Sequence, residues 1–276
     1  MLSVISPDSD ITLFNSTLEF NKEGFRDINH NLSKTNRTRI AFIGDSFTFG
    51  WGINDTNETF AELTGKQLNS EPQNFGIPGA NILDIYWVMQ NYVLKYNPDI
   101  IVYAVYWNDL FFLKNTPEPD NLDIEYCSLI DGRSRSYYFF KSKIDNVLAK
   151  MRNKKKVLVY KIYNDTAYFN SYIGAVCFNS ILDKIKDDKR IIAFVIPSRP
   201  YRNEADINIE NEFQEAFREK NIKFIGNFSE RFWEKANSSI YYRDNLHFNE
   251  EGNLIIADIL SDELKTYSGG ILFNQS

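Results

Sequence analysis

Short apolar runs alternate with amphipathic stretches along most of this chain. The apolar runs have the length and the β-branched and aromatic content of buried strands. They cover residues 39–43, 73–77, 99–106, 190–196 and 223–225. Between them apolar side chains recur at helical spacing, over residues 56–69, 82–93, 210–220 and 249–267. Alternation of this kind predicts an α/β fold in which helices cover both faces of a mainly parallel, five-stranded sheet.

The chain is expected to form one domain preceded by an arm. Residues 1–38 are mostly polar and are interpreted as an N-terminal arm packed on the domain, which covers residues 39–276. Residues 110–161 break the alternation, because they are too long for a loop and rich in Tyr, Phe and Lys. Residues 142–151 within them are predicted to be helical. We interpret this stretch as an insertion that leaves the sheet after a strand and could cover a site there.

Composition excludes several classes of function. The 276 residues carry a formal net charge of -6 with scattered basic residues, which argues against nucleic-acid binding. Cys127 and Cys177 lack CxxC spacing, which excludes a zinc knuckle, and a disulfide between them stays open. We expect neither a metal site nor a cofactor. The start of the chain lacks a basic segment followed by a long apolar one, and residues 100–107 are too short to span a bilayer. We expect a soluble protein, cytoplasmic by default, and leave its oligomeric state open.

An imidazole base has only two candidates, His30 and His247. Asp244 lies three residues before His247, directly ahead of the last predicted helix. At this spacing a carboxylate can orient an imidazole and stabilise its charged form. Taken alone, the pair is explained equally well by a helix-capping Asp beside an exposed His.

A serine nucleophile is suggested where the first predicted strand ends. Ser46 follows Gly44 and Asp45 and precedes a short helical segment over residues 47–50. A strand-to-helix turn exposes a serine hydroxyl and directs backbone N–H groups toward negative charge. For this motif alone, simple capping of the helix by Asp45 or Ser46 is the better explanation.

Two further residues follow strand ends in the same way. Asn108 follows the strand over residues 99–106, and its amide could donate a hydrogen bond to a developing oxyanion. Gly79 follows the strand over residues 73–77 and could bring a backbone N–H close to the same point. Each is also an ordinary turn residue. Together with Ser46 they converge on one edge of the sheet, because parallel strands present their carboxyl ends there.

Four sequence blocks then carry a family resemblance: Ile43-Gly44-Asp45-Ser46, Gly76-Ile77-Pro78-Gly79, Trp107-Asn108-Asp109 and Asp244-Asn245-Leu246-His247. In order and separation they resemble the conserved blocks of the SGNH (GDSL-like) hydrolases. The resemblance spans residues 39–267, and four blocks in order are far more specific than any one of them. It implies a flavodoxin-like three-layer α/β/α sandwich, in agreement with the apolar pattern.

The resemblance also implies a role for each matching residue. Ser46 would attack an ester carbonyl, His247 would take and return the proton, and Asp244 would orient His247. The oxyanion would meet the N–H groups of Ser46 and Gly79 and the side chain of Asn108.

Other positions around these blocks support the site or depart from the family pattern. Asp45 and Asp109 are expected to support the loops rather than to react. Tyr106 stands where the family usually has Gly, which predicts a reshaped acyl pocket or local turn. Phe248 stands where Pro is common.

The arm contains a second, weaker resemblance. The segment Asn21-x-x-Gly24-Phe25-Arg26 is similar to one that precedes the nucleophile in SGNH proteins associated with bacterial glycans. Arg26 could contact substrate, although a structural ion pair is the favoured reading. His30 is expected to be a surface residue.

These residues leave several functions open. The leading hypothesis is an esterase that removes O-acyl groups, O-acetyl above all, from a carbohydrate through an acyl-serine. The second is a carbohydrate O-acyltransferase that uses the same site, and the third is a non-catalytic glycan-binding protein on the same fold. A membrane-lipid lipase is a further alternative.

Overall fold

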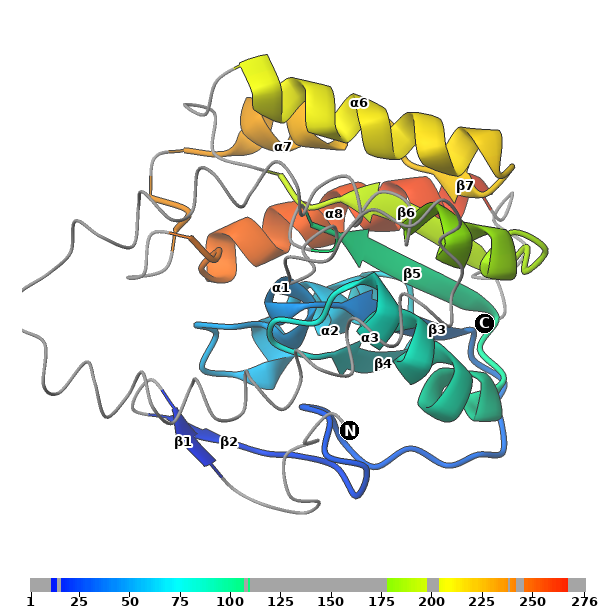
Figure 1. Cartoon of the computed structure of the whole chain (residues 1–276). Helices are drawn as coiled ribbons and strands as arrows, with labels where there is room; N and C mark the ends of the chain where they lie inside the picture. Colours follow the sequence, from blue (N-terminus) through cyan, green and yellow to red (C-terminus); the bar gives the residue numbers. More distant parts are fainter. Residues whose placement is uncertain are drawn as a thin grey trace, which may run out of the picture.

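A five-stranded parallel sheet forms the middle layer of the protein in this computed structural model (Figure 1). Its strands are β3 (Arg39–Gly44), β4 (Glu71–Gly76), β5 (Ile100–Val105), β6 (Ile191–Val195) and β7 (Lys223–Phe224). They lie in the order β4-β3-β5-β6-β7, and all neighbours pair in parallel. This is the doubly wound order of flavodoxin-like folds, so the predicted fold class is confirmed.

The structure describes residues 11–13, 16–106, 109, 178–197, 204–237, 239–241 and 246–267. Residues 178–185 are helical, and the named α-helices are α1 (Ser46–Phe49), α2 (Phe60–Gln67), α3 (Ile82–Val88), α6 (Glu204–Glu219), α7 (Phe228–Lys235) and α8 (Glu250–Tyr267). Shorter turns are the 3-10 helices η1 (Thr56–Glu58) and η3 (Leu94–Tyr96) and the π-helix η2 (Met89–Val93). Ahead of the sheet, β1 (Ile11–Leu13) pairs antiparallel with β2 (Ser16–Leu18).

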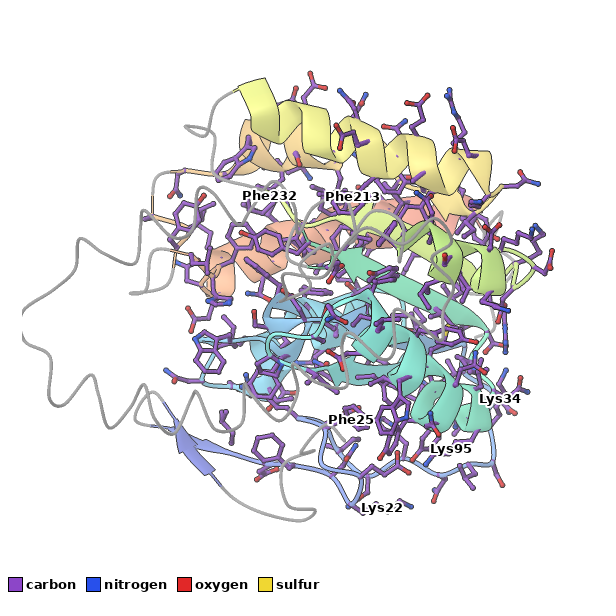
Figure 2. The ribbon with its side chains drawn as sticks, viewed as in Figure 1. Lys22, Phe25, Lys34, Lys95, Phe213 and Phe232 are labelled. Atoms are coloured by element: carbon purple, nitrogen blue, oxygen red, sulfur yellow. The ribbon has the colours of Figure 1, made fainter. Side chains whose placement is uncertain are left out.

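Alternate residues of the buried strands face two separate hydrophobic cores. On one face the strands pack against α3, η2, residues 178–185 and α6, which contributes Phe213. On the other face they pack against α1, α2, α7 and α8, with Phe232 contributed by α7. Figure 2 shows these two phenylalanine side chains among those that fill the space between the layers. Strands buried on both faces explain why the apolar runs are continuous rather than alternating.

Most predicted strands agree with the structure to within about two residues. The helix predicted over residues 210–220 begins six residues earlier, at Glu204, and the helical residues 178–185 were not predicted. Two other differences are informative. The helix expected over residues 56–69 is broken at Thr59, whose extended backbone and side chain cap α2. The helix expected over residues 82–93 changes from α3 to the π-helix η2 after Val88. The predicted insertion over residues 110–161 lies outside the described residues. Across the described residues, no helix combines the length and apolar character needed to cross a membrane.

Candidate active site

The turn after β3 places Ser46 at the start of α1. Asp45 caps this helix, because its Oδ1 accepts a hydrogen bond of 3.0 Å from the Phe47 N–H. Gly44 lets α1 pack directly on the sheet, since a Cβ there would lie 2.2 Å from Thr48 Oγ1 and 2.9 Å from the Ala104 carbonyl. The Gly-Asp-Ser motif therefore serves both packing and capping, and Ser46 stays partly exposed beside them.

The second glycine block supports α1 from the neighbouring strand. A Cβ on Gly76 would lie 2.2 Å from the Phe49 nitrogen and 2.5 Å from the Thr48 carbonyl carbon, so the backbone of α1 rests on β4. Asn74 links the two elements further, because its Nδ2 donates to the Thr48 carbonyl at 2.8 Å and its Oδ1 accepts from the Gly76 N–H at 2.9 Å. The position of Ser46 is thus set by contacts that tolerate little change.

His247 meets Ser46 from the far end of the sequence. The Ser46 Oγ and His247 Nε2 atoms are 2.7 Å apart, which is hydrogen-bonding distance. His247 is 8% exposed. Its ring lies 4.8 Å from the ring of Phe47 and 5.9 Å from that of Trp51, measured between centroids. An imidazole held in this way beside a serine hydroxyl can act as its general base.

Aromatic residues hold the segment that carries His247. Phe248 pairs with Tyr241 in an isolated antiparallel bridge, and its buried ring lies 4.8 Å from Phe232 and 5.5 Å from Phe47. Phe248, at the position where Pro is common, thus helps to fix the neighbouring histidine. Sequence reasoning missed the contacts of Phe47 and Trp51 with His247, because nothing in their spacing distinguishes them from ordinary core aromatics.

Gly79 lies in the turn between β4 and α3. The Ile77 N–H donates to the Gly44 carbonyl and the Ala80 N–H to the Ile77 carbonyl, each at 3.0 Å, which ties this turn to the nucleophile strand. Gly79 has a φ of 74° and is exposed, and apart from its two chain neighbours none of the described residues comes within 4 Å of where its Cβ would be. A positive φ favours glycine at this position, because a side chain there would strain the backbone.

Asp109 holds the end of β5. Its Oδ2 accepts hydrogen bonds from the Tyr103 hydroxyl at 2.8 Å and from the Tyr106 N–H at 3.1 Å, and the residue is fully buried. Burial, reinforced by the negative charge of Asp45, raises the pKa of Asp109 well above its usual range. Tyr106 is also buried and packs its ring 4.7 Å from that of Phe47. Tyr106, in place of the family's glycine, therefore packs against the same Phe47 ring that contacts His247.

Two predicted site residues, Asp244 and Asn108, lie outside the described residues, so their roles stay predictions. Within the described part of the chain, no group of three or more His, Cys, Asp or Glu side chains is arranged to hold a metal ion.

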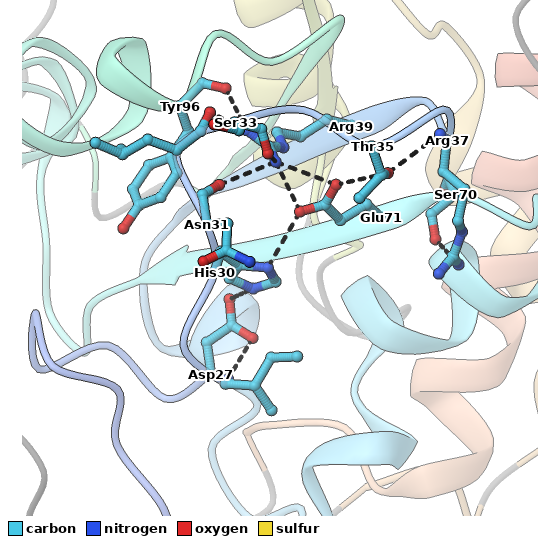
Figure 3. Close-up of polar contacts among 12 residues, drawn as sticks. Asp27, His30, Asn31, Ser33, Thr35, Arg37, Arg39, Ser70, Glu71 and Tyr96 are labelled. Atoms are coloured by element: carbon cyan, nitrogen blue, oxygen red, sulfur yellow. Dashed lines mark hydrogen bonds and ion pairs between the residues drawn. The ribbon is translucent and has the colours of Figure 1, made fainter.

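The prediction for His30 is wrong, because this residue is buried at the amino-terminal side of β4 rather than on the surface. Its Nε2 lies 2.9 Å from Asp27 Oδ2 and its Nδ1 3.5 Å from Glu71 Oε1, and Glu71 also pairs with Arg39 (Figure 3). Burial opposes protonation of His30, but its hydrogen bond to the Asp27 carboxylate and the charges of Asp27 and Glu71 outweigh this effect and raise the pKa of His30. His30 therefore joins the arm to the sheet.

Arg26 is structural, as favoured, but it contacts carbonyl groups instead of a carboxylate. Its side chain is 1% exposed, and it takes part in none of the ion pairs among the described residues. Its hydrogen bonds go to the carbonyl of Phe49, the last residue of α1, and to carbonyls of the loop that follows.

Comparison with known proteins agrees with this geometry. Residues 42–255 match the GDSL-like lipase/acylhydrolase family over most of the chain. The chain belongs to this family. The resemblance to the SGNH hydrolases is thereby confirmed, and the protein is a GDSL-like ester hydrolase. A comparison with curated proteins finds no match.

Solved structures share the fold of this GDSL-like hydrolase at low sequence identity. A lipolytic protein of the G-D-S-L family from Desulfitobacterium hafniense has 14% identity and a TM-score of 0.50, over 82% of this chain and 99% of that one. A psychrotrophic esterase from Pseudoalteromonas sp. has 12% identity and a TM-score of 0.50, over 84% and 99%. A carbohydrate esterase family 2 enzyme from Corynascus thermopiles has 12% identity and a TM-score of 0.51, over 86% of this chain and 68% of that one.

Proposed function

We propose that this GDSL-like hydrolase is a serine esterase that removes O-acyl groups, O-acetyl above all, from a carbohydrate. The observation that carries the proposal is the 2.7 Å contact between Ser46 Oγ and His247 Nε2 at the carboxyl edge of the sheet. Parallel α/β sheets bind ligands at that edge. The carbohydrate part rests on the sequence of the arm, and a carbohydrate esterase is among the structures with this fold.

In the proposed reaction Ser46 Oγ attacks the ester carbonyl carbon while its proton passes to His247 Nε2. The carbonyl oxygen becomes an oxyanion, which would be met by the N–H groups of Ser46 and Gly79 and the side chain of Asn108. The bond to the alcohol then breaks, and His247 returns the proton to the departing alkoxide. Water resolves the acyl-serine by the same steps, with Asp244 orienting His247 throughout.

An O-acyltransferase would share every step up to the acyl-serine. The acyl group would then pass to a sugar hydroxyl in place of water, which requires a bound acceptor and a site that excludes water. A non-catalytic glycan-binding protein is the third alternative. It gives no reason for a serine hydroxyl and an imidazole to be held in contact.

The test compares wild-type protein with Ser46→Ala on p-nitrophenyl acetate, butyrate and octanoate and on acetylated oligosaccharides. Loss of a nucleophilic serine should lower the rate by about a thousand-fold or more. Ser261→Ala is the matched control, because it removes a buried serine hydroxyl that has no hydrogen-bond partner among the described residues. Full activity of Ser46→Ala would refute the proposal. Preferential transfer of acetyl to an added sugar would favour the acyltransferase, and inactivity of the wild type on every ester would favour the binding protein.

A further inference from the structure

Arg26 joins the N-terminal arm to the loop that follows the nucleophile helix. Its Nη1 donates to the carbonyls of Gly50 at 2.6 Å and Phe49 at 3.4 Å. Its Nη2 donates to the carbonyls of Ile53 at 2.7 Å and Asn54 at 3.3 Å. The last four carbonyls of a helix have no hydrogen-bond partner within the helix, and α1 consists of only four residues. Its carbonyls therefore depend on partners outside the helix. The guanidinium thus satisfies the end of α1 and the loop beyond it.

The chemistry of this contact requires arginine. A planar guanidinium can serve carbonyls on two sides at once, whereas the ammonium of lysine is a single point of charge. Burial lowers the pKa of Arg26 to about 10, partly offset by the charge of Asp55, so the side chain stays protonated at neutral pH. The guanidinium carbon also lies 5.6 Å from the centre of the Phe49 ring, in a cation–π contact.

The loop held by Arg26 contacts both Ser46 and His247. Within it, the Gly50 N–H donates to the Phe47 carbonyl at 3.1 Å and the Trp51 N–H to the Ser46 carbonyl at 2.9 Å. The ring of Trp51 then lies 5.9 Å from that of His247. A shift of this loop would therefore move the backbone of Ser46 and the surface against which His247 rests.

The residues before and after Arg26 fix its backbone on the domain. Phe25 is buried, and its ring makes edge contacts with Phe75 and Tyr92, each at 5.1 Å between centroids. Figure 2 shows Phe25 on the arm, close to the helices that flank the sheet. Asp27 Oδ2 accepts from the Asn74 N–H of β4 at 2.8 Å. An arginine whose backbone is fixed in this way can hold a loop in place, whereas a mobile surface arginine cannot.

We propose that Arg26 is a positioning residue for the Ser46–His247 pair, so that the arm, although outside residues 42–255, is part of the catalytic apparatus. This inference rests on the proposed function. The guanidinium fixes the end of α1 and the position of Trp51. Without it, Ser46 and His247 spend less time at hydrogen-bonding distance. A misplacement of about 1 Å can cost on the order of a hundred-fold in rate.

Arg39 provides a matched control for the experiment. It is also fully buried and donates to carbonyls, those of Tyr96 at 2.6 Å, Asn31 at 3.0 Å, Ser33 at 3.1 Å and Leu32 at 3.2 Å, in addition to Glu71. It begins β3, whereas Ser46 follows the end of that strand. Arg39→Lys should therefore lower stability without changing the site.

The experiment measures the rate of Ser46 labelling by a fluorophosphonate, kcat and KM for p-nitrophenyl acetate, and Tm, for Arg26→Lys and Arg39→Lys. Both variants should lose stability. Only Arg26→Lys should lose ten-fold or more in labelling rate and in kcat, with KM changed less than three-fold. Equal labelling and kcat in the two variants would overturn the inference. If Arg26→Lys does not fold, Arg26→Gln, which keeps one planar donor, is measured at low temperature against the same prediction.

The two proposals can fail separately. If Ser46→Ala is labelled as fast as wild type, the proposed function is wrong whatever Arg26 does. If Ser46→Ala abolishes labelling but Arg26→Lys behaves as Arg39→Lys does, only the positioning role is wrong.

Discussion

The contact between Gly76 and α1 gives the sharpest prediction about how the sheet controls the nucleophile. In Gly76→Ala the new methyl group would lie 2.2 Å from the Phe49 nitrogen and 2.5 Å from the Thr48 carbonyl carbon. Non-bonded heavy atoms of these kinds prefer separations of about 3.5 Å. The backbone of α1 must therefore move by about 1 Å, because no flexible side chain can yield instead.

Two effects should follow from that displacement. Overpacking of this kind typically costs about 1–3 kcal/mol, which for a chain of this size lowers Tm by roughly 2–10 °C. A shift of about 1 Å in Ser46 should also slow the reaction by about a hundred-fold. It would do so by lengthening the 2.7 Å contact with His247.

The assay is fluorophosphonate labelling and p-nitrophenyl acetate hydrolysis, both measured well below Tm. Gly65→Ala serves as the control, because its methyl group would also be overpacked, at 2.4 Å from the ring of Pro72, but between α2 and the start of β4. The control should lose stability and keep its labelling rate. Wild-type labelling by a folded Gly76→Ala variant would refute the reasoning.

Two further predictions concern stability. Burial, with the charge of Asp27, raises the pKa of Glu62 from 4.5 to about 7, so its contribution to stability is complete below pH 4.5 and is lost as the pH rises to about 7. Glu62→Gln should therefore match wild type in free energy of unfolding at pH 4.5 and exceed it at pH 8, by at most about 3 kcal/mol, with a correspondingly higher Tm. If the variant and wild type had the same Tm at pH 8 as well as at pH 4.5, the raised pKa would be contradicted. Asn253→Ala removes the Oδ1 that accepts from the buried Phe60 N–H at 3.0 Å, and should cost about 1–3 kcal/mol in a chemical unfolding experiment. A change below about 0.5 kcal/mol would show that the N–H finds another partner.

The sheet could be predicted from the apolar pattern, whereas the meeting of Ser46 with His247 was implied by the resemblance of four sequence blocks to a known family. Strands buried on both faces leave continuous apolar runs, and parallel strands bring their carboxyl ends to one edge. The pattern therefore places Ser46, Gly79 and Asn108 at one edge of the sheet. It does not by itself place His247 there, because His247 precedes a helix and its motif alone is explained equally well by a capping Asp beside an exposed His.

The surroundings of the site could not be predicted, because they depend on contacts between side chains distant in sequence. His30 was expected on the surface, yet it is buried between Asp27 and Glu71. Its burial follows from the way the arm lies on β4, which leaves no periodic signal. Arg26 was expected to pair with a carboxylate, and no pattern announces an arginine that serves backbone carbonyls.

The most direct test of the account is to locate the residue that a fluorophosphonate modifies. After reaction of the wild-type protein and digestion, mass spectrometry should find the label on the peptide that contains Ser46, at one label per chain. His247→Ala should lower the labelling rate by about a thousand-fold or more, since the serine would lose its general base. A label on another residue, or undiminished labelling of His247→Ala, would contradict the claim that Ser46 and His247 form the catalytic centre.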